Sequence, residues 1–153
     1  MDLSHLDKSK RARMVDVGDK PVSARTAVAE GSIRLTAETI GKIEGDAIAK
    51  GSVLATAQIA GIAAAKRTSE LIPLCHNLPL DHVGVEFALA PDHIRARATA
   101  RTTGRTGVEM EALTAVSAAL LTIYDMCKAV DKGMVLEGIR LVAKEKKELG
   151  IGD

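Results

Sequence analysis

The length, composition and charge of this chain are those of one globular domain, and they exclude several other classes of protein. It has 153 residues, of which 46% are hydrophobic and 27% are charged, so it carries enough apolar side chains for a core. The net charge of +1 gives no reason to expect nucleic acid or an anionic membrane as a partner of the whole surface.

The cysteine content and the N-terminal sequence indicate a reduced, cytoplasmic setting. Cys75 and Cys127 are the only cysteines, which argues against a disulfide scaffold. The charged N-terminal sequence lacks the apolar segment of a signal peptide. No apolar run approaches the roughly 20 residues that a membrane-spanning helix needs.

The first half of the chain is predicted to form an arm, a strand and two helices. Residues 1–24 lack periodicity, and we expect an N-terminal arm or loop that lies on other structure. Residues 25–35 are expected to form a strand. A helical pattern then begins at Thr36, which can cap its first turn, and three glycines divide the pattern into two helices. The second of these is expected at residues 52–68.

The second half is predicted to form a hairpin, a long helix and a last strand. Two prolines, Pro73 and Pro79, make residues 71–80 irregular, and apolar side chains then alternate with polar ones. The expected elements are strands at 82–90 and 94–101 around a turn at 91–93, a Gly-Thr loop at 101–107, a helix at 108–130, a turn at 131–133, a strand at 136–143 and a mobile tail at 145–153.

This order of elements predicts the fold class. Strand, helix, strand, strand, helix, strand is the order of the split βαβ or ferredoxin-like arrangement. That arrangement is an α+β fold in which a four-stranded antiparallel sheet carries its helices on one face. We expect the whole chain, residues 1–153, to form a single domain.

Both long helices are too apolar for a monomer. Neither residues 52–65 nor residues 112–124 include a charged side chain, and a helix that is apolar all round is normally buried all round. Because one four-stranded sheet cannot enclose both helices, we infer a subunit interface over the helix layer. The alternative is that Ala and Thr simply tolerate exposure. The scarcity of aromatic residues favours an oligomer, since a thin core often gains stability by association.

A carboxylate and an ammonium group lie together near the end of the predicted long helix. At 100° per residue, Asp125 and Lys128 fall on one side of that helix. They could form an ordinary surface ion pair, or, beside a charge-free run, a pair suited to general acid–base catalysis. The stripe expected to face the sheet lies next to them and consists of Leu113, Ser117, Leu120, Tyr124 and Cys127.

The segment between the two prolines offers further polar groups. Cys75 and His76 could be a nucleophile and its base, or metal ligands, but adjacent side chains rarely chelate one ion and no other cysteine follows at metal-binding spacing. We interpret His76 as a polar contact to a ligand, with the alternative that nearby backbone satisfies it. The other three histidines, His5, His82 and His93, are assigned no function.

Long segments of the chain resemble the cyclic pyranopterin monophosphate synthase family, also called molybdenum cofactor biosynthesis protein C. The resemblance covers about residues 3–144 and rests on AKGSVLATAQIAGIAAAKRTSELIPLCH, on TGRTGVEMEALTAVSAALLTIYDMCKAVDKGM, and on LSHLD and ARMVDV near the N-terminus. It implies a ferredoxin-like fold assembled as a hexamer, a trimer of dimers, with active sites at subunit contacts. It also implies a lyase that converts 3′,8-cyclo-7,8-dihydroguanosine 5′-triphosphate to cyclic pyranopterin monophosphate and releases pyrophosphate, an early step of molybdenum cofactor biosynthesis.

Matching positions imply the roles of individual residues. Asp125 and Lys128 resemble the acid–base pair of the family, and Lys50 resembles a further catalytic or phosphate-binding lysine. The implied substrate-binding residues are Leu74, Cys75, His76, Glu109, Met110, Glu111, Arg25 and Lys144, of which Arg25 and Lys144 would bind the triphosphate. Two departures from the family pattern are Asn77, where a proline is common, and the C-terminal EKKELGIGD, where a glycine-rich tail is common.

The implied chemistry needs no cofactor and no metal site, although Mg²⁺ could accompany the substrate phosphates. Two rival functions are considered. One is RNA binding by a basic hairpin, but this hairpin offers only Phe87 for the base stacking that RNA-binding sheets use. The other is a ligand-sensing regulatory module without catalysis. The basic residues of the hairpin are Arg95, Arg97, Arg101 and Arg105.

Overall fold

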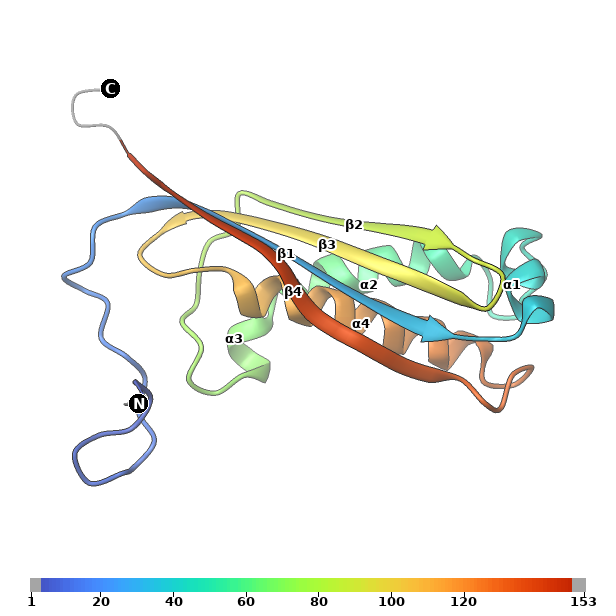
Figure 1. Cartoon of the computed structure of the whole chain (residues 1–153), viewed down its shortest axis with the longest axis horizontal. Helices are drawn as coiled ribbons and strands as arrows, with labels where there is room; N and C mark the ends of the chain where they lie inside the picture. The colour runs from blue at the N-terminus through green and yellow to red at the C-terminus, as the bar shows by residue number, and fades with distance from the viewer. Residues whose placement is uncertain (1–3, 150–153) are drawn as a thin grey trace.

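Four strands form one antiparallel sheet, and α2 and α4 cover one of its faces while α1 lies at one end (Figure 1). The computed structural model describes residues 4–149. The elements in chain order are β1 (Ser23–Arg34), α1 (Ala37–Glu44), α2 (Val53–Lys66), α3 (Thr68–Leu71), β2 (His82–Leu89), β3 (His93–Gly104), α4 (Glu109–Cys127) and β4 (Val135–Glu148). The strand order β2-β3-β1-β4 confirms the predicted ferredoxin-like α+β fold.

The predicted elements are present, but both long strands extend beyond their expected ends. β3 continues to Gly104, which pairs with Ser23 of β1, so the Gly-Thr loop is shorter than expected. β4 continues to Glu148, which also pairs with Ser23. Residues 145–148, expected in a mobile tail, are therefore hydrogen bonded to a central strand. Residues 150–153 of that expected tail lie outside the described residues.

Small side chains line the helix-facing side of the two central strands. Ala27 and Ala29 of β1, and Ala96, Ala98 and Ala100 of β3, are completely buried. Each presents only one methyl group, so α4 can approach the sheet closely. This close approach explains how the fold is built with one phenylalanine, one tyrosine and no tryptophan.

Two glycines mark where the helices approach most closely. A β-carbon added to Gly31 of β1 would lie 2.9 Å from a methyl carbon of Val116 and 3.0 Å from one of Leu120. One added to Gly61 of α2 would lie 2.8 Å from the carbonyl oxygen of Ala115. The backbone of α4 therefore packs directly against α2 at Gly61, the side chains of α4 pack against the sheet at Gly31, and neither glycine can accept a side chain without a shift.

The buried face of α4 differs from the predicted stripe. Leu120 and Cys127 are completely buried as expected, but Leu113 and Ser117 are only half-buried and Tyr124 is exposed. The residues that face the core instead include Ala112, Ala115, Val116, Ala119, Leu120, Ile123 and Cys127. The prediction was wrong by about one position, because a helix that is apolar on every side does not indicate which side is buried.

By length and hydropathy alone, α4 could cross a membrane. Half of its apolar stretch, however, is buried inside the fold. Its packing against β1, β3 and α2 is that of a core helix.

The end of α4 is joined to the start of α1 through the buried carboxylate of Asp131. That carboxylate accepts hydrogen bonds from the Thr36 amide and the Thr39 hydroxyl, each at 3.0 Å, while Thr36 caps α1 as predicted.

Candidate active site

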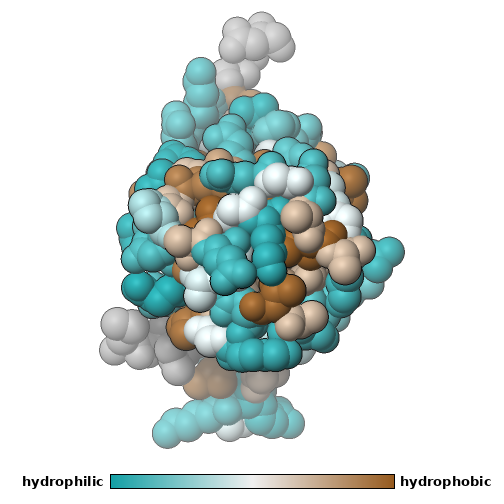
Figure 2. Space-filling view, turned by 90° about the vertical axis from the view of Figure 1, so that its right-hand side faces the viewer, coloured by the Kyte–Doolittle hydropathy of each residue, from teal (hydrophilic) through white to brown (hydrophobic). Residues whose placement is uncertain are grey.

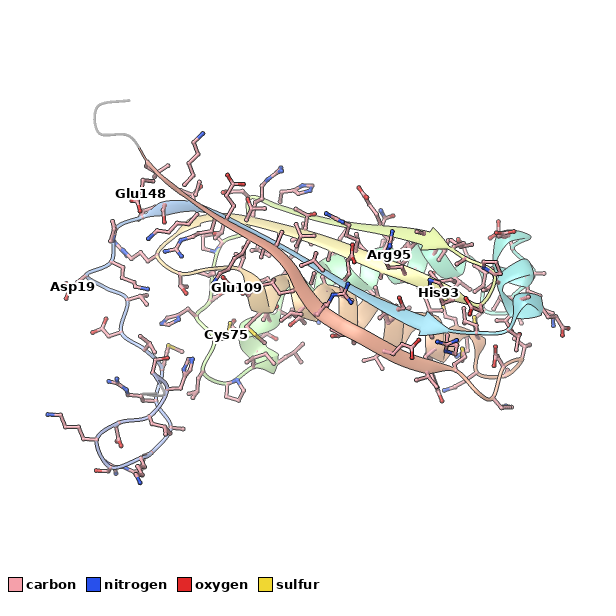
Figure 3. The ribbon with its side chains drawn as sticks, viewed as in Figure 1. Asp19, Cys75, His93, Arg95, Glu109 and Glu148 are labelled. Carbon is pink, nitrogen blue, oxygen red and sulfur yellow. The ribbon has the colours of Figure 1, made fainter. Side chains whose placement is uncertain are left out.

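The residues proposed for the site lie in two groups at opposite ends of α4. Cys75 and Glu109 of the first group lie at the end where α4 begins; His93 and Arg95, which are not site residues, mark the opposite end of the molecule (Figure 3). Asp125 and Lys128 follow on the last turn of α4 and just after it. At about 1.5 Å per residue, Glu111 and Asp125 are separated by about 21 Å along the helix axis. One chain therefore does not bring all the predicted site residues together.

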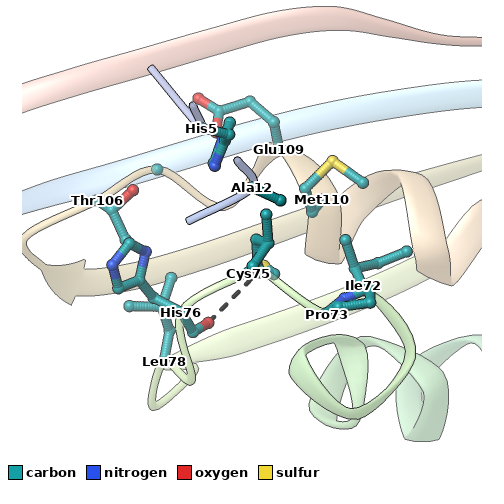
Figure 4. A pocket seen from close by; sticks show the side chains of 12 residues that line it. His5, Ala12, Ile72, Pro73, Cys75, His76, Leu78, Thr106, Glu109 and Met110 are labelled. Atoms are coloured by element: carbon teal, nitrogen blue, oxygen red, sulfur yellow. Dashed lines mark hydrogen bonds between the residues drawn. The ribbon is translucent and has the colours of Figure 1, made fainter. Parts of the chain in front are cut away.

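The first group lines a cleft of about 640 Å³ at the N-terminal end of α4 (Figure 4). Its walls come from the irregular segment after α3, from the loop before α4, from the first turn of α4 and from the N-terminal arm. Apolar side chains predominate, and His76 and Glu109 are among the few polar groups. The lining residues from the predicted set are Leu74, Cys75, His76, Glu109 and Met110.

Glu111 lies behind Cys75 and is the most unusual group of the site. Its side chain is 3% exposed, and its Oε1 atom has no hydrogen-bond partner among the described residues. Its other oxygen, Oε2, accepts a long contact of 3.8 Å from the Cys75 thiol. Burial raises the pKa of the Glu111 carboxyl. A buried carboxyl group with a free acceptor is costly for stability, which is typical of a group that meets a ligand.

Cys75 is not an activated nucleophile. Burial, followed by the proximity of Glu111, raises the pKa of its thiol to about 11. The thiolate is the nucleophilic and metal-binding form of cysteine, and at neutral pH this thiol remains protonated. Of the two chemical roles left open for the Cys75–His76 pair, nucleophilic attack and metal binding, neither is favoured by this environment.

His76 is held by the N-terminal arm. Its Nε2 atom lies 2.5 Å from the carbonyl oxygen of Val15. A carbonyl oxygen only accepts hydrogen bonds, so Nε2 carries the proton and donates it. In the neutral ring Nδ1 is then the free acceptor. One interpretation of His76 was that nearby backbone satisfies its hydrogen-bonding groups. That holds for Nε2, which bonds to Val15, while Nδ1 is left available to a ligand.

A second cleft, lined by three basic side chains and by the acidic Glu109 and Glu145, adjoins the first. Arg25 and Lys144 line it together, as expected for two partners of one phosphate chain. Lys146, two residues further along β4, also lines it and was not predicted, because it lies in the segment read as a tail. Gly107 and Glu109 line both clefts, so the two form one continuous surface with an apolar part and a basic part.

The second group is a triad of charged side chains at the C-terminal end of α4. The Asp125 carboxylate accepts a hydrogen bond from Lys50 at 3.1 Å and one from Lys128 at 2.8 Å. Lys128, followed by Lys50, lowers the pKa of Asp125, and Asp125 in turn raises the pKa of Lys128. All three side chains are at least half exposed. In one chain they therefore form a solvated ion cluster, which contributes little to stability.

The end of the molecule that carries this triad is mostly hydrophilic, with separate hydrophobic patches (Figure 2). Val130 and Val135, on either side of the turn after α4, are 49% and 47% exposed. On the helix layer, Ile59 of α2 and Leu121 of α4 are 68% and 58% exposed. The apolar helices are thus incompletely covered by the sheet, as the sequence indicated.

Comparison with known proteins identifies the family. The MoaC family matches residues 14–147 of the chain. The chain belongs to the MoaC family. Relatives named cyclic pyranopterin monophosphate synthase include one from Novosphingobium aromaticivorans, 59% identical over 97% of this chain and 95% of its own. Another, from Chloroflexus aggregans, is 60% identical over 93% and 87%, and one from Peptoclostridium acidaminophilum is 54% identical over 94% and 92%.

The cleft of this MoaC family member also includes residues that the sequence analysis did not predict, and His5 is the one histidine among them. His5, which was assigned no function, lines the cleft beside Glu109 (Figure 4). Nothing in the local pattern of the arm predicts this, because the position depends on how the arm folds back onto the body. The other two histidines left without a function, His82 and His93, do not line this cleft. Within residues 4–149, no group of three or more His, Cys, Asp and Glu side chains is arranged to hold a metal ion.

Proposed function

We propose that this chain is a lyase that converts 3′,8-cyclo-7,8-dihydroguanosine 5′-triphosphate to cyclic pyranopterin monophosphate and releases pyrophosphate. Family membership and the names of its relatives support this reaction. The observation that carries the proposal is the join between an apolar cleft and a basic cleft through Gly107 and Glu109, because the substrate has a flat heterocycle at one end and a triphosphate at the other.

The heterocycle binds in the apolar cleft. Leu74 and Met110 supply apolar walls, and His76 offers Nδ1 as an acceptor. Glu111 lies behind Cys75 and does not itself line the cleft. Its buried Oε1 lacks a donor among the described residues, and we propose that it accepts from an N–H group of the guanine-derived ring once the Cys75 thiol shifts aside. Ring N–H to carboxylate hydrogen bonds are charge-assisted and strong. Cys75 acts here as a neutral thiol between Glu111 and the cleft.

The triphosphate binds in the basic cleft. Arg25 and Lys144 come from neighbouring strands, and their charges neutralise the pyrophosphate as it leaves. Glu109 lies at the junction of the two clefts, where the sugar of the substrate would meet it. We propose that no resident cofactor takes part and that Mg²⁺ enters only as a counter-ion of the phosphates, since the cationic side chains of the cleft already supply positive charge.

Asp125 and Lys128 transfer protons, and Lys50 assists them, in a site completed by a second copy of the chain. In one copy Asp125 is about 21 Å along α4 from Glu111, and Asp125 and Lys128 each stabilise the charged form of the other. General acid–base work needs a pKa nearer to neutrality. A second copy that packs across the exposed apolar residues of the helix layer would supply the missing half of the site and the burial that changes these pKa values.

The assembly is proposed to be a hexamer built as a trimer of dimers, and the location is proposed to be the cytoplasm. Both cysteines are free thiols in this fold, as is usual in a reducing compartment. Light scattering tests the assembly. A single 16.1 kDa species at micromolar concentration would contradict it.

RNA binding is not favoured. Arg97 of the predicted basic hairpin is paired with Glu30 at 2.9 Å, and Phe87 packs against the core and is not presented for stacking. The decisive experiment is incubation with enzymatically made cyclised dihydro-GTP, with pyrophosphate as the readout. Release of pyrophosphate supports the lyase and excludes a purely regulatory module. Binding without release favours the regulatory module.

A further inference from the structure

The N-terminal arm contains a small, internally bonded hairpin over residues 5–13. Leu6 and Ala12 form an antiparallel bridge, and the Arg13 amide donates to the His5 carbonyl at 2.8 Å. The Asp7 carboxylate closes the turn by accepting from the amides of Ser9 and Arg11, at 2.8 and 2.9 Å. These bonds lie within the arm itself and do not depend on contacts with the body of the protein.

This hairpin forms the outer wall of the apolar cleft. His5 and Ala12 both line it, opposite the segment that carries Cys75 and His76 (Figure 4). His5 shares its wall with Glu109, the residue that also borders the basic cleft. An imidazole at this place can donate a hydrogen bond to the part of a bound nucleotide that lies between its base and its phosphates.

The described part of the arm, residues 4–22, has little hydrogen bonding to the body of the protein. Within residues 4–149, the bond from His76 to the Val15 carbonyl is the one hydrogen bond that joins arm residues 4–22 to the remainder. Most arm side chains are exposed. An element with its own internal bonds and one attachment can move as a unit, and this one would carry His5 with it.

We propose that the arm closes the apolar cleft over the substrate and that His5 is a further substrate-binding residue, which the hairpin organised by Asp7 delivers. This inference rests on the proposed function for the identity of the substrate. The arm also positions His76, because the Val15 carbonyl holds the Nε2 proton and leaves Nδ1 as the free acceptor.

The first test is steady-state pyrophosphate release by His5→Ala and His5→Gln, with His82→Ala as the matched control on the exposed edge strand. His5→Ala is expected to raise KM about 2- to 10-fold, the range for losing a hydrogen bond to a neutral group such as the sugar, with a smaller effect on kcat. His5→Gln keeps a donor and should recover part of the loss. A wild-type KM in His5→Ala, or an equal loss in His82→Ala, would overturn the assignment.

The second test does not depend on catalysis. Alkylation of Cys75 by N-ethylmaleimide, read by peptide mass spectrometry, reports how far the arm covers the cleft. Asp7→Ala should open the hairpin and speed alkylation, whereas Asp19→Ala, which removes an exposed arm carboxylate outside the hairpin (Figure 3), should not. Equal rates in these two variants and the wild type would overturn closure by the arm. If the wild type releases no pyrophosphate, the proposed function fails. The alkylation rate of Cys75 then still decides, by itself, whether the arm covers the cleft.

Discussion

Lys50 donates two hydrogen bonds to Asp125, one to its carboxylate at 3.1 Å and one to its main-chain carbonyl at 3.2 Å. The second bond satisfies a carbonyl group in the last turn of α4 that has no partner within the helix. Lys50 therefore serves as a helix C-terminal cap as well as a member of the charged triad. A structural role and a catalytic role predict different results when these residues are changed.

Asp125→Asn distinguishes the two roles. The change keeps the shape of the side chain and removes its charge. If Asp125 transfers protons, turnover should fall about 10²- to 10⁴-fold. The free energy of unfolding of the single chain should hardly change, because the triad of one chain is exposed and exposed ion pairs contribute little to stability. Pyrophosphate release and urea denaturation measure the two quantities. Full turnover in Asp125→Asn would end the acid–base assignment.

Mixing two inactive variants tests whether the site is shared between copies. Asp125→Asn and Glu111→Gln each remove one half of the proposed site. If one site takes Asp125 from one copy and Glu111 from another, a mixed pair contains one intact site. After denaturation and joint refolding at equal amounts, activity should recover to about a quarter of the wild-type value. A mixture no more active than the two variants alone would contradict a shared site.

Glu111→Gln should stabilise the protein while it impairs activity. The pKa of Glu111 is raised in the folded state by burial, so its ionised form is destabilising. The wild type therefore loses stability relative to the variant as pH rises from the pKa of a free glutamate to the raised pKa of the folded state. The variant should be about 1–2 kcal/mol more stable at about pH 7.5, and the difference should shrink near pH 4.5, close to the pKa of a free glutamate. Equal stability at both pH values would show that Glu111 is not a buried charge.

The alkylation rate of Cys75 should continue to rise well above pH 9. Its thiol has a pKa of about 11, so only a small fraction is thiolate at neutral pH. A rate profile with a midpoint near 8.5, the value for a free cysteine, would show that the thiol is not shielded. Cys75→Ser is the control for the reaction of other groups. This variant should retain most of its turnover, because the thiol is not proposed to react.

Removal of divalent metal should leave catalysis largely intact. Dialysis against a chelator, followed by the pyrophosphate assay with and without Mg²⁺, tests this directly. We expect at most a modest loss, which Mg²⁺ restores through the substrate phosphates. A complete loss that one equivalent of a transition metal restores would instead reveal a resident metal.

Local sequence patterns were sufficient to predict the secondary structure and the fold class. The alternation in residues 82–101 defined a hairpin, and two charge-free segments defined the helices. These features depend on neighbours in the chain, since strand and helix periodicities of 2 and 3.6 residues are local properties. The motifs around His76 and Asp125 identified the family for the same reason, because a motif is a local arrangement.

Only the tertiary structure decided which side of α4 is buried, where the arm lies and how the site is divided. A helix that is apolar all round has no preferred side, and contact with Gly31 and Gly61 settles the choice. His5 reaches the cleft because the hairpin folds back on the body. Asp125 and Glu111 lie on the same helix, and the length of that rigid helix separates them by about 21 Å. The sequence could name both as site residues, but only packing in three dimensions determines that one chain holds them apart.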